Sequence, residues 1–547
     1  MINQTDQPLA LGMHPADTVD NDNKHDDLAK EEVVVAPSIY DHTTHLEQED
    51  QAPPVTKKEL WSYYLYYQGD CGTGPNGYAP TQFQNLMTQA SYSLADGPAG
   101  AGQCKGDSAH CFLPFGSGER SVSSIFLLAN GISFAIMTLG FTTFGGLQDY
   151  KTYNRWFLMG LTIVCWASCL GFLGVKDGSD WRAAMALYMI GYITYGATLV
   201  FYAAIFPRLA RALPTERENR DKLRQGEITF EEFEKRSSMN RNMVSSISTA
   251  HSNWGYLLTL SLNLSILLPL ASSNQVNNYV IALCTVYWII LGVPWFIFQK
   301  TRPGPDLPKG SNVVTVGWQQ IIVAVKEIRK LPQTFIYLGG FFLLADGLNT
   351  TGTMVNIVQN NNIAFSFLDF TYLGLVQAGC SVLSLYAFWY IQKWFRLDTK
   401  VMFTVTNVFS CLIPLWGMIG MWTDKIGFHN RWEFYMYNAV FGLFQAPYYA
   451  YSQTMLSEIL PPGFEGTFFS LFGLTNRASS IIGPNVLSAI ISASGNNYTG
   501  FAFLFALCTA ATLLLVIFVD VKKGRADALA YAERKRAEQY QSNDHIE

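Results

Sequence analysis

Long, almost uncharged stretches of about 20 residues recur along the chain, and they limit what it can fold into more than any other feature. A helix of that length matches the hydrocarbon thickness of a bilayer, about 30 Å. Only 14% of the residues are charged, against about 25% in an average soluble domain. The pattern therefore predicts an all-α polytopic membrane protein and argues against a soluble enzyme.

We predict twelve membrane-spanning segments after an acidic tail of residues 1–58, in which 12 Asp or Glu accompany 4 Lys or Arg. The tail has few large apolar residues, so we expect it to be disordered. The predicted spans are residues 59–80, 121–145, 154–176, 181–206, 246–270, 277–299, 333–357, 367–392, 400–423, 432–458, 466–492 and 500–520. Three further segments complete the division: a charged loop (207–245), a linker with an amphipathic segment (300–332) and a tail (521–547). The linker lies between the sixth and seventh spans and suggests two sets of six.

Lys and Arg concentrate in alternate loops, which sets the expected orientation because cytosolic loops retain basic residues. The loop after the fourth segment holds nine between Arg208 and Arg241, and the linker holds six between Lys300 and Lys330. The loops on the opposite side hold only six in total. Both termini are thus expected in the cytosol.

Two segments that begin the two sets of six share a pattern of a buried acid followed by Gly, Thr and Asn. Residues 68–76 (QGDCGTGPN) contain Asp70 and Asn76, and residues 344–352 (LADGLNTTG) contain Asp346 and Asn349. Gly-interrupted helices at corresponding positions of two repeats indicate a binding site near the bilayer midplane. A chance match in a Gly-rich chain is the alternative.

Three motifs carry a family resemblance. The residues 145–150 (GGLQDY), with Asp149 and then Arg155, resemble the loop between the second and third spans of the major facilitator superfamily, which latches the cytosolic face. The runs 78–84 (YAPTQFQ) and 345–351 (ADGLNTT), supported by 442–458 (GLFQAPYYAYSQTMLSE), resemble the fungal autophagy-related protein 22 family of vacuolar effluxers over residues 59–520. The resemblance implies a vacuolar membrane protein that exports amino acids, with leucine, isoleucine and tyrosine as expected substrates, during starvation.

Intramembrane charges are the leading candidates for transport because a carboxylate or guanidinium in a span is costly unless it is used or paired. Asp70 and Asp346 could bind an ammonium group or a proton, or could make structural hydrogen bonds between helices. Arg477 could pair with a substrate carboxylate or extend to the interface. Glu458 is expected to be an interfacial residue or, with Asp149 and Arg155, part of a cytosolic gate. Polar neutral residues that could line the path are Gln82, Gln84, Asn130, Asn349, Asn356, Gln377, Gln445 and Asn476.

The loop between the first two segments holds Cys104 and Cys111, for which a disulfide is plausible in an oxidising lumen. The sequon at Asn497 could be glycosylated, although it lies close to the membrane. Nine cysteines form no zinc pattern, so no metal or other cofactor is expected, and the charge distribution suggests no nucleic-acid partner. Without a P-loop motif, we expect transport to be secondary and proton-coupled; the rival hypothesis is a membrane scaffold or lipid-handling protein.

Overall fold

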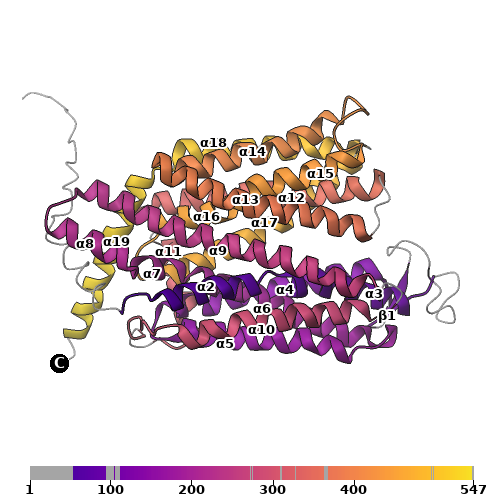
Figure 1. The fold of residues 1–547 in the computed structure, drawn as a ribbon, viewed down its shortest axis with the longest axis horizontal. Coiled ribbons are helices and arrows are strands. Elements are labelled where there is room, and N and C mark those ends of the chain that lie inside the picture. The colour runs from indigo at the N-terminus through magenta and orange to yellow at the C-terminus, as the bar shows by residue number, and fades with distance from the viewer. Residues whose placement is uncertain are drawn as a thin grey trace, which may run out of the picture.

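Long helices running side by side make up most of the protein, as Figure 1 shows. The structure is a computed structural model that describes residues 53–93, 104, 111–116, 118–270, 273, 275–307, 311–326, 328–362, 367–494, 496 and 498–544. Residues 1–52 of the predicted acidic tail, and Asn497, lie outside the described residues.

The helices of the first half of the chain form one group and those of the second half form another (Figure 1). The first group comprises α2 (Lys57–Gly69), η1 (Thr73–Tyr78), α3 (Ala79–Ala90), α4 (Val122–Phe144), α5 (Tyr153–Gly171), α6 (Trp181–Ala203), α9 (Phe230–Leu267) and α10 (Val276–Phe298). The second comprises α12 (Pro332–Asn362), α13 (Phe367–Phe395), α14 (Thr399–Ile419), α15 (Arg431–Val440), η7 (Phe441–Gln445), α16 (Ala446–Ile459), α17 (Glu465–Ser494) and α18 (Thr499–Phe518). Helix α9 packs along α13, and α17 packs against α4 and α6, so two seams join the groups.

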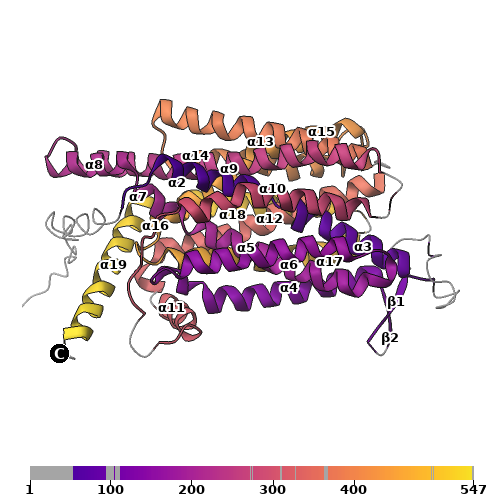
Figure 2. The ribbon, with the colours of Figure 1, turned by 60° about the horizontal axis from the view of Figure 1, so that its bottom comes forward.

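Elements outside these two groups lie at the two ends of the bundle (Figure 2). At one end lie α7 (Phe206–Arg211), α8 (Pro214–Arg224), α11 (Thr315–Lys326) and α19 (Val521–Asp544), and we call this the α19 end. At the other lies an antiparallel hairpin of β1 (Phe112–Phe115) and β2 (Gly118–Ser121), and we call this the hairpin end. The short 3-10 turns η3 (Gly146–Asp149), η4 (Phe172–Gly174), η5 (Gly178–Asp180) and η6 (Ile328–Lys330) connect longer helices.

Within the described residues, seven helical segments are long and apolar enough to cross a membrane: residues 124–149, 153–174, 178–211, 276–298, 371–395, 399–419 and 499–518. Large apolar side chains remain exposed on them, such as Ile290 (65%), Ile297 (66%) and Leu383 (71%). Such a surface suits hydrocarbon rather than water. Helices also occupy the other five predicted segments, but they are not among these seven, so the count of twelve remains a prediction.

The first predicted segment differs most from expectation because it is broken and longer. Helix α2 ends at Asp70, Gly72 adopts a positive φ of 75°, and the π-helical turn η1 leads into α3, which continues to Ala90. A side chain at Gly72 would collide with the hydroxyl of Tyr195, so both the backbone conformation and the packing require glycine. The Gly-rich sequence therefore encodes a break near the middle of this segment.

Other boundaries shift for local reasons. Helix α9 begins at Phe230, 16 residues before the predicted span, because Thr229 caps it by accepting a hydrogen bond from the N–H of Glu232. The predicted amphipathic segment forms α11, which packs on α4: a Cβ at Gly317 would meet the carbonyl oxygen of Thr142 at 2.5 Å. The indole of Trp318 also donates to Thr143 at 3.2 Å. Helix α11 is therefore docked on the bundle at the α19 end.

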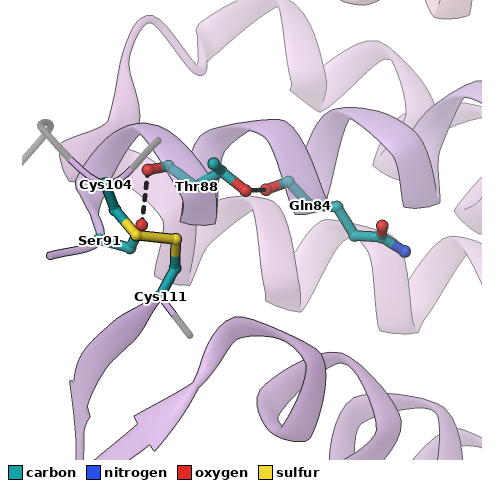
Figure 3. The surroundings of a disulfide bond; sticks show 5 residues. All are labelled: Gln84, Thr88, Ser91, Cys104 and Cys111. Carbon is teal, nitrogen blue, oxygen red and sulfur yellow. Dashed lines mark hydrogen bonds between the residues drawn. A yellow bond between two sulfur atoms is a disulfide. The ribbon is translucent and has the colours of Figure 1, made fainter. Parts of the chain in front are cut away.

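A disulfide joins Cys104 to Cys111, with 5.8 Å between the Cα atoms. It lies beside the end of α3, where the hydroxyl of Ser91 donates to the carbonyl oxygen of Thr88 at 2.7 Å (Figure 3). The carbonyl oxygen of Cys111 accepts from the N–H of Val122, the first residue of α4. The bridge therefore fastens the connection between α3 and α4 at the hairpin end.

Candidate transport pathway

A cavity of 410 Å³ lies between α9, α12, α13 and the α15–η7–α16 segment. On α12 its lining extends from Leu348 to Gln359, the part of the helix that leads toward the hairpin end. The other end of α12 lies at the α19 end, where the side chain of Gln333 accepts from the N–H of Asp520 at 2.7 Å. The cavity therefore occupies the middle and the hairpin side of the bundle.

All the residues that the structure describes around this cavity are uncharged, and Asn and Gln, with six of the fifteen positions, are the most frequent kind. They are Tyr256, Leu348, Asn349, Gly352, Thr353, Asn356, Gln359, Leu373, Gly374, Gln377, Tyr437, Asn438, Phe441, Gln445 and Tyr449. Each amide side chain offers both a donor and an acceptor, so the wall can hydrogen-bond to either sign of charge. Asn349, Asn356, Gln377 and Gln445 are polar residues that the sequence suggested for the path.

Gln359 is a residue that sequence reasoning missed. Its side chain is only 3% exposed, and within the described residues its Nε2 has no hydrogen-bond partner. A buried donor without a partner costs roughly 1–3 kcal/mol, so a ligand that accepts from it would gain that difference. A single glutamine near the end of a predicted span gives no sequence signal of such a role.

The α19 end of the bundle is closed by contacts between the two halves. Asp149, at the end of η3, is 2% exposed, and its carboxylate accepts from the N–H groups of Gly466 (2.6 Å) and Thr467 (3.0 Å) in the first turn of α17. Arg208 on α7 donates to the same carboxylate at 2.7 Å, and its Nε lies 3.6 Å from a carboxylate oxygen of Glu465. Arg211 also pairs with Glu465. Two acids and two arginines therefore fasten η3 and α7 to α17.

Glycine allows the close approach behind this network. A Cβ at Gly145 would overlap the side chain of Ser470, and one at Gly466 would meet the Cβ of Gln148 at 2.9 Å. The side chain of Gln148 then donates to Ser470 at 3.1 Å. The Gly-Gly-Leu-Gln-Asp motif thus forms a surface against which α17 fits with backbone contact.

Glu465 stays ionised in this setting. Burial alone would raise the pKa of its carboxyl, but Arg211 and Arg208 outweigh burial and lower the pKa to about 2. The sequence contains a weak signal for this residue, since an acid at the start of an apolar run is typical of a helix N-terminus. Its two arginine partners lie more than 250 positions away and give no such signal.

The structure does not bring Arg155 to Asp149. Its guanidinium donates instead to the carbonyl oxygen of Phe296 at 2.8 Å and to the hydroxyl of Thr301 at 3.3 Å. Arg208 takes the place of the basic partner expected from the nearby sequence. It can do so because α7 returns to η3 after the chain has passed through α5 and α6.

Glu458 lies buried at the end of α16, also at the α19 end. It accepts from Thr399 at the start of α14 (2.6 Å), from Ser238 on α9 and from Arg525 on α19 (2.7 Å). Burial lowers the pKa of Arg525, but Glu458 and Glu234 outweigh it and raise that pKa. Glu458 therefore joins α19 to the start of α14 and, through Ser238 on α9, also contributes to the contact between the halves.

Asp70 and Asn76 lie on the broken first segment, away from the described cavity lining. Asp70 is 1% exposed, its Oδ2 accepts from Thr198 on α6 at 3.4 Å, and its backbone N–H caps α2 through Tyr66. Asn76 is exposed on η1. The acid thus contacts helices of its own half.

Asp346 and Asn349 occupy successive turns of α12 but face different surroundings. Asp346 is 4% exposed and accepts from the N–H of Gly483 inside α17 at 2.9 Å. Asn349 lines the cavity, and its amide donates to Asn476 at 3.4 Å. Arg477 follows Asn476 on α17, and its side chain lies outside the described residues.

Two groups of helices that contact each other through ion pairs at one end, with a polar cavity beside them, have the fold of major facilitator proteins. Solved structures agree. The fucose:proton symporter of E. coli superposes with a TM-score of 0.54 over 84% of this chain and 98% of that chain, at 11% identity. The human organic anion transporter MFSD10 gives 0.52 over 84% and 98%, at 14% identity.

The family model described as "Vacuole effluxer Atg22 like" matches residues 55–529, so the chain belongs to that family. Autophagy-related protein 22 of Neurospora crassa is 22% identical over 88% of this chain and 74% of its own length. Autophagy-related protein 22-1 of Aspergillus niger is 22% identical over 88% and 92%. The resemblance stated from the sequence is thereby confirmed, as is the assignment to transporters rather than enzymes.

Proposed function

We propose that this protein exports amino acids released by autophagic degradation from the vacuole lumen to the cytosol. The α19 end then faces the cytosol and the hairpin end faces the lumen. This orientation follows the basic residues, since α7, α8 and the first turns of α9 hold the nine Lys and Arg between Arg208 and Arg241. It also places the Cys104–Cys111 disulfide on the lumenal side, where disulfides persist.

The observation that carries the proposal is an amide-lined cavity separated from the α19 end by ion pairs between the halves. An amino acid is a zwitterion with no net charge, so a wall of donors and acceptors without fixed charge can bind both its ends. We assign the unpartnered Nε2 of Gln359 to the substrate carboxylate, with Asn349 and Gln377 available to the ammonium group. Tyr256 and Tyr449 supply apolar surface for leucine, isoleucine or tyrosine side chains.

We keep Asp70 and Asp346 as the proposed proton carriers, although neither is among the residues that line the cavity. Asp346 is the stronger candidate because it is one turn from Asn349 and bonds to the backbone of α17, the helix that also makes the contact with Asp149. Protonation of its carboxylate would weaken its hold on Gly483 and so loosen α12 from α17. Arg477, two turns before Gly483 on α17, is proposed to pair with the substrate carboxylate in part of the cycle.

The test is efflux of labelled leucine and tyrosine from proteoliposomes that contain the purified protein, with and without an acidic interior. We expect Gln359→Leu to reduce efflux at least tenfold, because the variant removes the buried donor while keeping the volume. Asp346→Asn should abolish the dependence on the pH gradient. Gln82→Leu is the matched control, since Gln82 is equally buried but bonds to Asn277 in the first half, away from the cavity.

The outcomes separate the hypotheses. Efflux that persists without the gradient makes the protein a facilitator and removes the proton role from Asp346. Absence of efflux for every amino acid, with the protein correctly folded, would overturn amino-acid export and leave a scaffold or lipid-handling role. Equal losses in the Gln359 and Gln82 variants would show that the cavity assignment is wrong.

A further inference from the structure

A small second pocket opens at the α19 end on the outer side of the first half. It lies between the start of α5, the junction of α6 with α7, and the end of α10 with the segment that follows it. Its volume is 50 Å³, several times the roughly 10–15 Å³ that one water requires. That space accommodates one phosphate-sized group and excludes a sugar or inositol ring.

The lining of this pocket is strongly basic. Five of its residues are cationic: Lys151, Arg155, Arg208, Lys300 and Arg302. No carboxylate is among the lining residues that the structure describes. The pocket thus differs from the contact of η3 and α7 with α17, where two acids face two arginines.

Three of the five cations are held by acids that lie outside the lining. Arg302 pairs with the buried Glu59 through two hydrogen bonds of 2.6 and 2.9 Å. Lys151 lies 3.3 Å from Asp306, and Arg208 pairs with Asp149 at the gate. These acids fix the side chains in place and neutralise part of the charge.

The side chains of Arg155 and Lys300 are left with neutral partners only, while the backbone N–H of Lys300 donates to the carboxylate of Glu59 at 2.9 Å. In the described part of the chain Arg155 donates to a backbone carbonyl oxygen and a hydroxyl, and the Nζ of Lys300 donates to the carbonyl oxygen of Pro54 at 3.3 Å. Both side chains are partly exposed, so an anion can reach them. Two positive charges therefore remain without a counter-charge at one small pocket.

The pocket also lies where the apolar surface of the bundle ends. Trp156, next to Arg155 on α5, is 59% exposed, and Ile297 and Phe298 at the end of α10 are 66% and 46% exposed. These side chains are suited to hydrocarbon, while the cations beside them are suited to headgroups. Helix α5 begins at Tyr153 without a side-chain cap, so its N-terminal N–H groups add to the positive potential.

We propose that this pocket binds the phosphate monoester of a phosphorylated membrane lipid. The phosphate enters the pocket between Arg155 and Lys300, which form charge-assisted hydrogen bonds with its oxygens. The remainder of the headgroup stays outside, and the acyl chains lie along Trp156 and the end of α10. A bound phosphate would connect α5 to the segment after α10. Arg208, which pairs with Asp149, lines the same pocket.

The experiment measures binding to the purified full-length chain in detergent, using short-chain phosphatidylinositol 4-phosphate as the probe. Phosphatidylinositol without the phosphate monoester tests the phosphate, and soluble inositol 1,4-bisphosphate tests the need for the lipid. We expect the phosphorylated lipid to bind at least tenfold more tightly than either. We also expect its affinity to fall as salt rises, because the contacts are ionic.

The variant Arg155→Gln/Lys300→Gln should weaken this binding at least tenfold. The control Lys326→Gln/Arg329→Gln removes the same charge from exposed positions on the linker and should bind as the parent does. Lys300→Gln alone, which disturbs only one contact to a backbone oxygen, keeps the test valid if the double variant is unstable.

Equal binding of the two lipids, or equal losses in the pocket and control variants, would overturn the site. Binding of inositol 1,4-bisphosphate as tight as that of the lipid would keep the phosphate site but overturn its lipid source. None of these results depends on amino-acid flux, so they are independent of the proposed transport function.

Discussion

Replacing Asp149 with asparagine should open the α19 end, because this carboxylate accepts hydrogen bonds from α17 that exist only while the two halves are together. It accepts from the N–H groups of Gly466 and Thr467 and pairs with Arg208. Asparagine keeps the size but loses the charge, and its NH2 group presents hydrogens where the carboxylate accepted them.

The magnitude follows from the kind of contact that is lost. A hydrogen bond to a charged group contributes about 1.5–3 kcal/mol, and Asp149 accepts three from α17, donated by the N–H groups of Gly466 and Thr467 and the hydroxyl of Thr467. The retained amide oxygen still accepts one hydrogen bond, so we expect a loss of about 3 kcal/mol from the closed state, which corresponds to roughly a hundredfold shift toward opening.

Hydrogen–deuterium exchange measures that shift directly. The amides in the first turn of α17, Gly466 and Thr467, should exchange about a hundredfold faster in Asp149→Asn. Amides in α13 and α9, which form the other seam between the halves, should change less because no contact of Asp149 reaches them.

Glu433→Gln is the matched control. Glu433 is also a buried acid that accepts several hydrogen bonds, from the N–H groups of Gly427 (2.7 Å) and Phe428 (2.6 Å) and from the indole of Trp416 (2.7 Å). All of these lie at the hairpin end within the second half, so this variant should lower the melting temperature without exposing α17. Unchanged exchange of α17 in Asp149→Asn, or the same increase in both variants, would refute the reasoning.

Three further outcomes can be checked. Gly483→Ala should lower stability by about 1–3 kcal/mol in thermal melts, because its Cβ would overlap the hydroxyl of Thr350 and come within 2.5 Å of a carboxylate oxygen of Asp346; an unchanged melting temperature would mean that α17 can shift. Cys104→Ser should cost about 2 kcal/mol, and reduction should then have no further effect on the melting temperature. The lowered pKa of Glu465 means that its contribution to the closed state is complete above the ordinary pKa of 4.5 and is lost as pH falls below it; exchange of α17 should accelerate as pH falls below 4.5, and Glu465→Gln should remove that part of the acceleration.

The sequence predicted the helices well because their main determinant, a long apolar run, is local. Helix α10 (Val276–Phe298) and helix α18 (Thr499–Phe518) agree with the predicted spans 277–299 and 500–520 to within two residues. The first segment was harder, since its break depends on the packing of Gly72 against Tyr195, which lies on α6. The extension to Ala90 could not be read from a stretch in which Tyr, Gly and Gln outnumber aliphatic residues.

The site was predicted less completely because its contacts join distant parts of the chain. The Gly-Asp motif around Asp149 is visible in the sequence, but its partners Arg208, Gly466 and Thr467 come from two other helices, whereas the sequence points to the nearby Arg155. The rule that intramembrane acids mark the path selected Asp70 and Asp346, which the structure places in contacts between helices. The cavity is lined by neutral amides, a residue type too common in this chain to stand out.

The distribution of charge explains how such a transporter can move between two states. The arginines and acids at the α19 end are desolvated when the halves are together, and hydration offsets much of the lost attraction when they separate. The closed end is therefore favoured by only a few kcal/mol, which is the range that the differential affinity of a ligand can shift. The cavity, by contrast, presents no fixed charge among its described residues, so it can close around a zwitterion without leaving an ion unpaired. In the proposed cycle, the ionic contacts at one end hold the closed state, and the amide-lined cavity supplies the binding energy that changes it.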